Sequence, residues 1–416
     1  MKKYVLLGLT TLTILAVTLA CRIPGLTPPA ATEEPQATQV IVEAEPTATK
    51  DSLPIPESTT TEDVSPSPEP AATDLEPTAG PPASPDNAGQ IAYTFNGNLW
   101  RYLIDSDEAI QMTTDAVTGD HMTTYRKPGF SPDGRYLAYN QGNNSWVTDL
   151  VNDILIDISA YGQFFAWSDD DSQFFGVKGD FACPDIEDLD DQYLINFDFL
   201  RFDIENISNP TLLANIGGGL KVPVEISDDG QWASIAHCAC YSECGSENLW
   251  HLPTASRIDP PIDMFPGNID FSPDNTQLTV SQHQMFGYMQ SPLYVANINY
   301  AGMTEIFSIP DVAPVNAQWS PDGAWLAFTG VIFDEDAFTD IDSCVRLVKP
   351  DGSLEYVAEC TFAEFVTWSP DGDQLLYTRR EGAKDQFYVY DLGTSAITKL
   401  PIQADPYTLV DWGRLP

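Results

Sequence analysis

Three carboxylates occupy the same place in a recurring motif, and together they could hold a cation. The motif is an aromatic or aliphatic residue followed by Ser, then Pro or Asp, Asp and usually Gly, as in Trp319-Ser-Pro-Asp-Gly323. The residue directly before it is Glu225 or Asp270 in two copies, and Asp411 holds the same place before Trp412, where the repeat is truncated. Because several carboxylate oxygens at one site favour calcium, the pattern predicts a bound Ca²⁺ if these copies converge on the central channel of a ring. The alternative is that water and neighbouring backbone amides satisfy the carboxylates.

A second set of candidates lies between the motifs, where we expect the second and third strands of each unit to be connected. These candidates are His283, Met285, Phe286, Tyr288, Arg379 and Arg380. Met and aromatic side chains are enriched at recognition surfaces, so the sequence predicts a binding face here. The same side chains could instead cover the end of the hydrophobic core.

Two acidic runs, residues 180–191 and 334–342, lie in equivalent segments. Carboxylates can bind calcium, but neither run has the Asp-x-Asp-x-Asp-Gly spacing of a calcium-binding loop. We therefore interpret both runs as solvated, charged loops.

The cysteines indicate an oxidising compartment. Six of them follow Cys21, namely Cys183, Cys238, Cys240, Cys244, Cys344 and Cys360. An even number in an exported chain predicts disulfides. Cys344 and Cys360 flank a turn at residues 350–353, and a hairpin there would place them opposite each other, within bonding distance.

The remaining four cysteines allow three pairings. Ring strain disfavours a bond between Cys238 and Cys240, which leaves Cys183 joined to one of these two. The alternative is a zinc cluster of His237 with Cys238, Cys240 and Cys244, which an oxidising compartment disfavours.

The sequence contains no recognised catalytic motif. It lacks the Gly-x-Ser-x-Gly, His-Glu-x-x-His and P-loop patterns, and its four His residues have no suitably spaced Ser or Asp partners. We therefore assign no catalytic residue and no required cofactor, and we favour a binding function. The alternative is a hydrolase or lyase that uses rim or channel carboxylates about 5 to 10 Å apart.

The motif predicts a repeat fold. Its six copies begin at residues 130, 167, 226, 271, 319 and 368, with steps of 37 to 59 residues. Pro, Asp and Gly suit a tight turn, and a short apolar strand follows each copy, as in Leu326-Ala-Phe328. Repeats of this length are typical of propellers and solenoids.

The two ends of the repeat region complete one further unit. Ile91-Ala-Tyr93 matches the strand that follows the motif, and Val410-Asp-Trp412 matches the strand that precedes it. Pairing of the two would close a ring and remove exposed sheet edges. The sequence therefore predicts an all-β, seven-bladed β-propeller of four-stranded antiparallel blades over residues 89–416, closed by its N- and C-terminal strands.

These repeats resemble the WD40-like (PD40) blades of the TolB family, whose signature is the same Trp-Ser-Pro-Asp-Gly turn followed by an Ile-Ala-Phe-type strand. The resemblance is strongest in the copies at 130, 271, 319 and 368. It implies a propeller but no particular partner, since one fold serves many functions.

The N-terminus predicts export and lipid attachment. Lys2 and Lys3 precede an uncharged apolar run, which is typical of a signal peptide over residues 1–20. Val17-Thr-Leu-Ala-Cys21 resembles a bacterial lipobox, which implies lipidation of Cys21; an uncleaved membrane anchor is the alternative. Residues 21–88 are rich in Pro, Thr and Glu and contain no aromatic residue, so we expect a disordered tether.

The charge of the chain limits its partners. Its 416 residues hold 61 Asp and Glu against 19 Lys and Arg, a formal charge of −42. This excludes nucleic acid, because phosphate binding needs clustered cations, and it leaves the lipid as the contact with an anionic membrane. The sequence predicts a monomer of the bacterial cell envelope, outside the cytoplasm, that binds an envelope protein, peptide or glycan.

Overall fold

The computed structural model describes most of the region in which the sequence predicts a propeller. The described residues are 89–117, 125–182, 193–217, 221–237, 247–261, 266–282, 292–310, 312–334, 339–353, 355–360, 362–406 and 409–416. They all belong to the second of two compact units of the chain, Asp74–Pro416. The predicted signal peptide, Cys21 and the tether lie outside the described residues. No described segment is a helix of the length and apolar character needed to cross a membrane.

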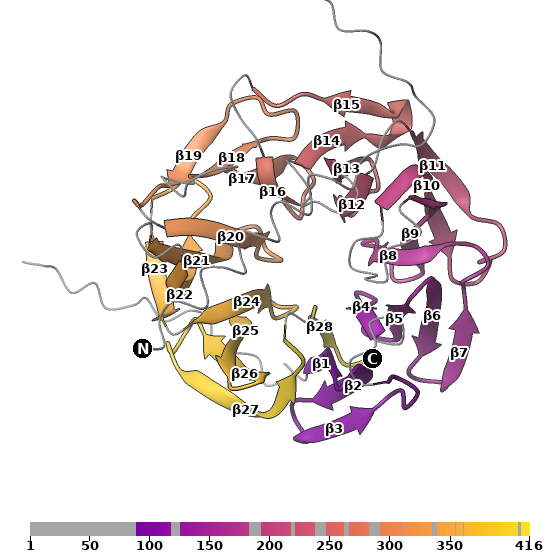
Figure 1. Ribbon diagram of the computed structural model, residues 1–416, viewed down its shortest axis with the longest axis horizontal. Coiled ribbons are helices and arrows are strands. Elements are labelled where there is room, and N and C mark those ends of the chain that lie inside the picture. Colours follow the sequence, from indigo (N-terminus) through magenta and orange to yellow (C-terminus); the bar gives the residue numbers. More distant parts are fainter. Residues whose placement is uncertain are drawn as a thin grey trace, which may run out of the picture. The chain divides into compact units, whose positions relative to one another are not determined.

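Seven four-stranded antiparallel blades surround a central axis, which confirms the predicted fold class (Figure 1). From the axis outward, blade 1 consists of β28 (Asp411–Arg414), β1 (Gly89–Phe95), β2 (Asn98–Leu103) and β3 (Glu108–Gln111), and the strands of the other blades follow in the same order. Blade 2 consists of β4 (Tyr125–Phe130), β5 (Tyr136–Gln141), β6 (Asn144–Asp149) and β7 (Ile154–Asp157). Blade 3 consists of β8 (Gln163–Trp167), β9 (Gln173–Ala182), β10 (Tyr193–Asp203) and β11 (Thr211–Ile216).

The other four blades follow the same plan. Blade 4 consists of β12 (Lys221–Ile226), β13 (Trp232–His237), β14 (Glu247–His251) and β15 (Ser256–Ile258), with a short 3₁₀ helix at Leu252–Thr254. Blade 5 consists of β16 (Pro266–Phe271), β17 (Gln277–Gln282), β18 (Leu293–Asn297) and β19 (Thr304–Phe307). Blade 6 consists of β20 (Val312–Trp319), β21 (Leu326–Asp334), β22 (Thr339–Val348) and β23 (Glu355–Cys360). Blade 7 consists of β24 (Ala363–Trp368), β25 (Gln374–Glu381), β26 (Lys384–Asp391) and β27 (Ile397–Ala404).

The chain ends close the ring as predicted. In blade 1, β28 pairs with β1, and Trp412 lies opposite Ile91. The Gln90 side chain donates to the carbonyl oxygen of Gly134 in blade 2 (2.9 Å). Trp412 is buried in an apolar cluster with Ile91 and Phe387, so it packs blade 1 against blade 7. The terminal strand β28 therefore pairs with β1 and also contributes a buried side chain to the core.

The repeated motif forms a hydrogen-bonded turn between the first and second strands of a blade. In blade 6, the Ser320 hydroxyl donates to Asp322 Oδ1 (2.6 Å) and accepts from the backbone N–H of Trp325 (2.9 Å). Gly323 has a φ of +69°, a conformation that glycine adopts at little cost. The same pair of bonds is made by Ser131, Ser227, Ser272 and Ser369. In the copy at residue 167, which has neither Pro nor Gly, Ser168 instead donates to backbone carbonyls.

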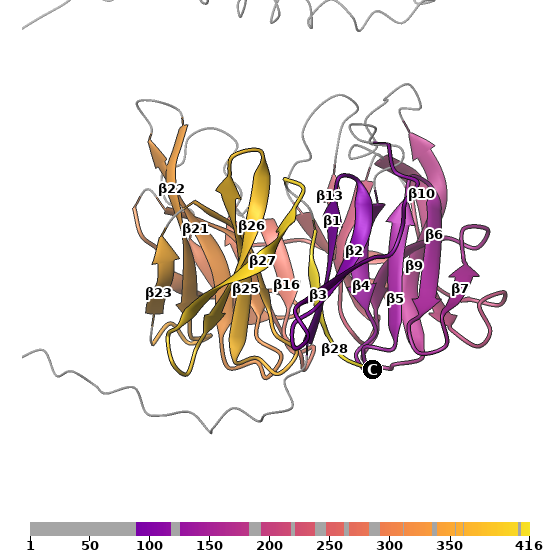
Figure 2. The same ribbon diagram turned by 90° about the horizontal axis from the view of Figure 1, so that it is seen from below.

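The ring has two different faces (Figure 2). The turn face carries the Ser-Asp-Gly turns, and β28 ends there. On the opposite face, here called the loop face, the second strand of each blade ends and the outermost strand leads to the next blade. The predicted binding residues belong to segments at the ends of second strands, so the topology assigns those of them that are described to the loop face.

Candidate functional site

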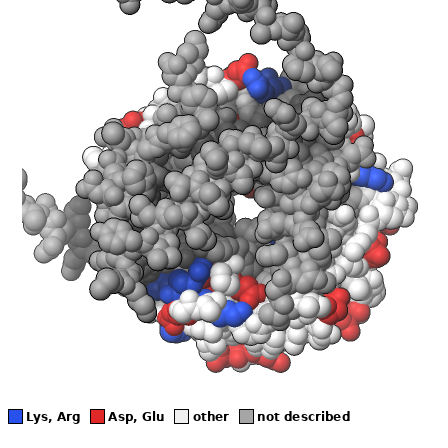
Figure 3. Space-filling view, viewed as in Figure 1, with Lys and Arg blue, Asp and Glu red and all other residues white. Residues whose placement is uncertain are grey.

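The innermost strands place seven equivalent residues around a central channel. In every blade, the residue before the motif is half-exposed, although the first motif residue beside it is buried. These seven residues are Gly129, Ala166, Glu225, Asp270, Gln318, Thr367 and Asp411. The space-filling view shows an opening at the centre of the ring (Figure 3). The predicted candidates Glu225, Asp270 and Asp411 therefore lie on strands that line the channel.

Two of these carboxylates connect neighbouring blades. Asp411 Oδ2 in blade 1 accepts a hydrogen bond from the backbone N–H of Phe130 in blade 2 (2.6 Å). Asp270 Oδ2 in blade 5 accepts one from the backbone N–H of Trp319 in blade 6 (2.8 Å). Backbone amides thus satisfy Asp270 and Asp411, which is the alternative that the sequence left open.

The predicted convergence of Glu225, Asp270 and Asp411 on one ion is not observed. Within the described ranges, no three His, Cys, Asp or Glu side chains lie close enough together to hold a metal ion. Glu225 and Asp270 lie on neighbouring blades, on β12 and β16, whereas Asp411 lies three blades away from either on β28. Asp411 is therefore separated from Glu225 and Asp270 by the width of the ring. Calcium binding by this protein stays a prediction.

The protein that surrounds the channel raises the pKa of these carboxyl groups, because burial disfavours the charged form. Burial raises the pKa of Glu225 to about 7 and that of Asp411 to about 6. Burial, together with repulsion by Glu225, raises the pKa of Asp270 well above its ordinary value. Near neutral pH, the inner ring therefore carries less negative charge than its composition implies.

One buried carboxyl group was missed by sequence reasoning. Glu247, at the start of β14, is 6% exposed. Its Oε2 accepts from the Ser234 hydroxyl (2.9 Å) and from the backbone N–H of Ile269 in blade 5 (3.1 Å). Burial raises the pKa of Glu247 to about 8. Glu247 belongs to no motif, so nothing in the sequence separates it from the many exposed acids.

A lysine on an innermost strand was also missed. Lys127 lies on β4, three residues before Phe130, and its Nζ lies 4.8 Å from the centre of the Phe165 ring on β8. Burial lowers the pKa of Lys127, while the charge of Glu225 raises it. The sequence does show that basic residues are scarce in this region, since residues 89–416 hold 15 Lys and Arg against 49 Asp and Glu, and this scarcity could have drawn attention to Lys127.

On the loop face, Arg379 and Arg380 lie near the end of β25. Arg379 Nη2 pairs with Glu359 Oε2 of blade 6 (2.6 Å), and its guanidinium lies 4.2 Å from the centre of the Tyr388 ring. Arg380 Nε pairs with Asp385 Oδ1 on β26 (2.5 Å). Both predicted binding-face arginines are therefore held in fixed positions by carboxylates.

Lys384, the first residue of β26, extends this arrangement to blade 1. Lys384 pairs with Asp405 and donates to Asn96 Oδ1 (3.0 Å), and its Nζ lies 4.6 Å from the centre of the Phe95 ring. We call Arg379, Arg380, Lys384, Tyr388 and Phe95 the blade 7 cluster. Lys and Arg side chains gather at the lower left of Figure 3, where Figure 1 places β25 and β26.

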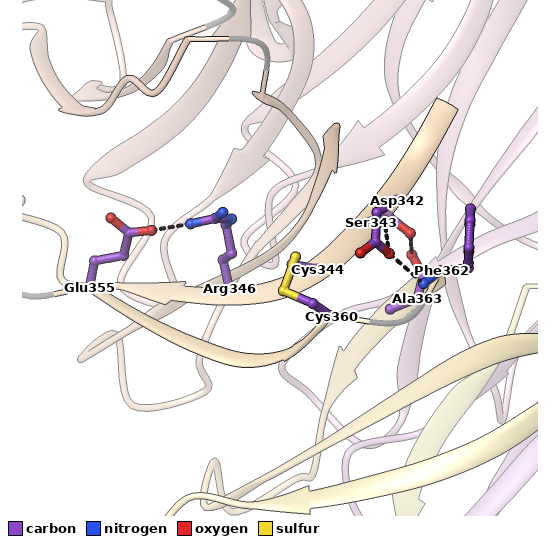
Figure 4. The surroundings of a disulfide bond; sticks show 8 residues. All are labelled: Asp342, Ser343, Cys344, Arg346, Glu355, Cys360, Phe362 and Ala363. Carbon is purple, nitrogen blue, oxygen red and sulfur yellow. Dashed lines mark hydrogen bonds and ion pairs between the residues drawn. A yellow bond between two sulfur atoms is a disulfide. The ribbon is translucent and has the colours of Figure 1, made fainter. Parts of the chain in front are cut away.

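Cys344 and Cys360 form a disulfide with their Cα atoms 4.1 Å apart (Figure 4). They lie opposite each other on β22 and β23, as the predicted hairpin requires. Cys344 is buried, whereas Cys360 is exposed at the end of the outermost strand. Beside them, the Ser343 hydroxyl donates to the carbonyl oxygen of Ala363 (2.6 Å), which connects blade 6 to blade 7.

Replacing both Cys344 and Cys360 by Ala is expected to lower the free energy of unfolding by about 3 kcal/mol. The bond closes a loop with a sequence separation of 16, and opening it returns conformational freedom to the unfolded chain. Urea unfolding under non-reducing conditions measures the loss. The control is the same comparison in dithiothreitol, where the difference between the two proteins should nearly vanish. An equal stability under non-reducing conditions would contradict the assigned role.

The other predicted sites lie outside the described residues. They are Cys183, Cys238, Cys240 and Cys244, and the binding-face candidates His283, Met285, Phe286 and Tyr288. The pairing of these cysteines, the zinc alternative and the part of these four side chains in binding stay predictions.

Comparison with known proteins establishes the fold. No protein-family model and no curated protein matches the chain. An oligogalacturonate lyase in complex with manganese is 16% identical with a TM-score of 0.54, covering 73% of this chain and 86% of that one. An oligogalacturonate lyase from Vibrio parahaemolyticus is 14% identical with a TM-score of 0.52, covering 71% and 83%.

A structure described as putative TolB from Agrobacterium tumefaciens is 14% identical, with a TM-score of 0.43, covering 79% of this chain and 99% of that one. The predicted membership of the TolB repeat family stays a prediction. At these identities, the solved structures that this chain resembles at TM-scores above 0.5 show that it shares their propeller fold, and the chemistry of the chain must be argued from its own residues.

Proposed function

We propose that this chain is a lipid-anchored propeller of the bacterial cell envelope that binds a protein, peptide or glycan over its loop face, without catalysis. The blade 7 cluster carries this proposal. Arg and Tyr are enriched at binding interfaces and often contribute most of the binding energy. The Arg379 guanidinium is already stacked on Tyr388 and held by Glu359, so little side-chain freedom is lost when a partner docks.

The N-terminal sequence supports the proposed location. A lipid on Cys21 would hold the chain at a membrane, and the Pro-rich segment that follows could extend on the order of 200 Å if fully stretched. A binding domain on such a tether can reach partners that are not at the membrane surface. On the turn face, the Ser and Asp side chains of the motif hydrogen-bond within their own turns.

A hydrolase or lyase that uses the channel carboxylates is supported less well. Glu225 and Asp270 do have raised pKa values on neighbouring blades, as a general acid would. However, Asp270 accepts the backbone N–H of Trp319, which gives it a structural role between blades 5 and 6. Burial of a blade-connecting carboxylate explains its raised pKa without a reaction.

The test of the proposed function compares capture by the loop face and by the turn face. The purified chain is immobilised and exposed to bacterial envelope extract. We expect the double variant R379A/R380A to lose the captured partner, with affinity reduced about 30-fold or more. The matched control is Arg135→Ala, which removes an arginine that also pairs with a carboxylate, Asp149 (2.7 Å), but follows the turn on the turn face. Capture that is unchanged in R379A/R380A, or equally lost in R135A, would refute the proposal.

A further inference from the structure

The outermost strand of blade 2 has an apolar edge that faces solvent. Ile154 and Leu155 of β7 are 53% and 60% exposed, and Val151, in the turn that leads into the strand, is 61% exposed. Ten large hydrophobic side chains are exposed among the described residues, and three of them lie within residues 151–155. Figure 1 shows β7 on the outside of the ring. A concentration of exposed apolar side chains in one short segment is typical of an interaction site.

The corresponding strand of blade 1 shows that the fold does not require these side chains. β3 has the same length as β7, and each strand follows an aspartate with a φ of +55°, Asp107 or Asp153. At its first two positions, where β7 has its exposed Ile and Leu, β3 has Glu108 and Ala109. The same local backbone therefore forms with polar or small residues, and the reason for the apolar pair lies in what contacts it.

The backbone of β7 is available for pairing on its outer side. Within the described ranges, β7 pairs only with β6, over four consecutive residues without a bulge. The carbonyl oxygen of Ser145 accepts the N–H of Ile158 (3.0 Å), so Ile158 faces β6, and alternation gives Ile156 the same direction. The N–H and C=O groups of Leu155 and Asp157 therefore face outward, where a further strand could pair with them.

The outermost strands of the other blades have features that oppose such pairing. Irregular register, proline and lysine each protect a sheet edge. The strands β11, β19, β23 and β27 all shift register against their neighbours, and β27 also contains Lys399 and Pro401. β15 has only three residues, with Arg257 at its centre. Among the seven outermost strands that the structure describes, β7 thus combines regular pairing with exposed apolar side chains.

We propose that the outer edge of β7 binds an extended segment of a partner protein as a fifth strand of blade 2, and that this segment has Lys or Arg on both sides of apolar residues. Backbone hydrogen bonds to the Leu155 and Asp157 edge hold the segment, and its apolar side chains cover those of β7. Opposite charges across a pair of strands stabilise it. The exposed carboxylates of Asp153 and Asp157 lie at the two ends of the apolar residues and select basic residues there.

The charge of the propeller favours a basic partner over a second copy of this chain. Residues 89–416 carry a formal charge of −34, from 15 Lys and Arg against 49 Asp and Glu. Two such propellers repel each other, whereas a basic segment is attracted. The inference is independent of the proposed function of the loop face, because R379A/R380A changes residues of another blade and should leave this binding intact.

The test titrates the full chain with a capped, fluorescently labelled peptide, Lys-Val-Val-Val-Lys, and measures fluorescence anisotropy at physiological ionic strength. We expect saturable binding at sub-millimolar concentration. Two controls separate strand pairing from attraction between charges. Lys-Gly-Ser-Gly-Lys has the same charge but no apolar residues, and a peptide methylated on its central amide nitrogen lacks one backbone donor. Each should bind about 10-fold more weakly or less. Absence of saturable binding by the first peptide, or equal binding by all three, would overturn the proposal.

The variant Leu155→Pro removes the outward N–H and the apolar side chain together. Proline is tolerated on an edge strand where the N–H faces solvent, so the melting temperature should change little while affinity falls about 10-fold or more. The matched control is Ala109→Pro in β3. Leu99 accepts the N–H of Met112 (2.9 Å), so alternation makes Ala109 face outward as Leu155 does. A109P should therefore leave peptide binding unchanged.

Three results would contradict the site. They are unchanged affinity in L155P, an equal loss of affinity in A109P, and a dimer in sedimentation velocity that L155P abolishes, which would assign the edge to a second copy of this chain. If L155P does not fold, Leu155→Lys decides, because it keeps the backbone and replaces the exposed apolar side chain by a cation that repels the probe. Undiminished binding of Lys-Val-Val-Val-Lys to L155K would refute the proposal.

Discussion

Deleting residues 409–416 is expected to lower the free energy of unfolding by about 5 kcal/mol or more and to promote self-association. The deletion removes β28, and with it the buried side chain of Trp412 from the cluster that joins blades 7 and 1. Loss of a buried Trp side chain alone typically costs about 3–5 kcal/mol. It also removes every pairing partner of the inner edge of β1, from Gly89 to Ala92. An unpaired strand edge is a template for association with other chains.

The comparison that makes this result specific is a shorter deletion. Removing only Leu415 and Pro416 leaves all of β28 in place, and the chain should unfold at the same urea concentration as the intact protein. Tryptophan fluorescence during urea unfolding measures stability, and sedimentation velocity measures association. If the longer deletion unfolds like the shorter one, ring closure contributes nothing to stability and the role given to β28 is wrong.

Ring closure could be predicted from sequence because it follows from incomplete repeats. Ile91-Ala-Tyr93 lacks a motif before it and Val410-Asp-Trp412 lacks a strand after it, and the structure pairs Ile91 with Trp412. The motif itself is informative because its Ser, Asp and Gly hydrogen-bond within five residues, so the turn forms from local sequence alone. A turn whose hydrogen bonds form between nearby residues, and which recurs along the chain, is the kind of feature that a single sequence predicts best.

The hydrogen-bond partners of the inner carboxylates could not be predicted in the same way. Asp270 and Asp411 accept backbone amides of the next blade, at Trp319 and Phe130, which lie 49 and 281 residues away in sequence. These contacts depend on blade twist and on the diameter of the ring, and neither can be derived from residue spacing. The same holds for Glu247, whose partner Ile269 also belongs to the next blade. Contacts between blades decide the chemistry of the channel.

Lys127 shows a different limit of sequence reasoning. It has a positive φ and lies in the bulge between Arg126 and Gly129, and no propensity rule places a lysine there. What sets the residue apart is its difference from Asn316, which occupies the equivalent bulge in blade 6. Repeated blades share backbone conformations, so a residue that departs from the preference of its position in one blade is a candidate for a role of its own.

The stability of the propeller is expected to fall as the pH rises from about 5 to above 8, with Glu247 as one contributor. Burial raises the pKa of this carboxyl group to about 8 in the folded protein, from an ordinary value of 4.5. Between these two values, the folded state keeps a proton that the unfolded state releases. The folded state therefore binds more protons, and the free energy of unfolding decreases with increasing pH across this window. Below about pH 4.5 both states are protonated, and the contribution of Glu247 is fully present.

Glu247→Gln isolates this contribution. Glutamine keeps an oxygen that can accept from the Ser234 hydroxyl and the Ile269 N–H, and it carries no charge at any pH. We expect the variant to match the parent near pH 5 and to exceed its free energy of unfolding by on the order of 4 kcal/mol above pH 9, as a raised pKa of this size implies. Urea unfolding at a series of pH values measures both curves. Equal pH dependence in parent and variant would show that Glu247 is ionised in the folded protein and that other groups stabilise its charge.

Asp149→Asn provides a control of opposite sign. The Arg135 guanidinium, with hydrogen bonds from Asn152, holds the pKa of Asp149 well below its ordinary value. That carboxylate stabilises the folded state above its unfolded pKa, and its contribution is lost as the pH falls through the folded one. D149N should therefore lower stability throughout the range from pH 5 to 9 and leave the slope there unchanged, whereas E247Q should reduce the slope without lowering stability at pH 5. Because a general weakening of the fold would lower both curves in parallel, opposite responses of the two variants would trace the pH dependence to the carboxyl group buried between blades 4 and 5.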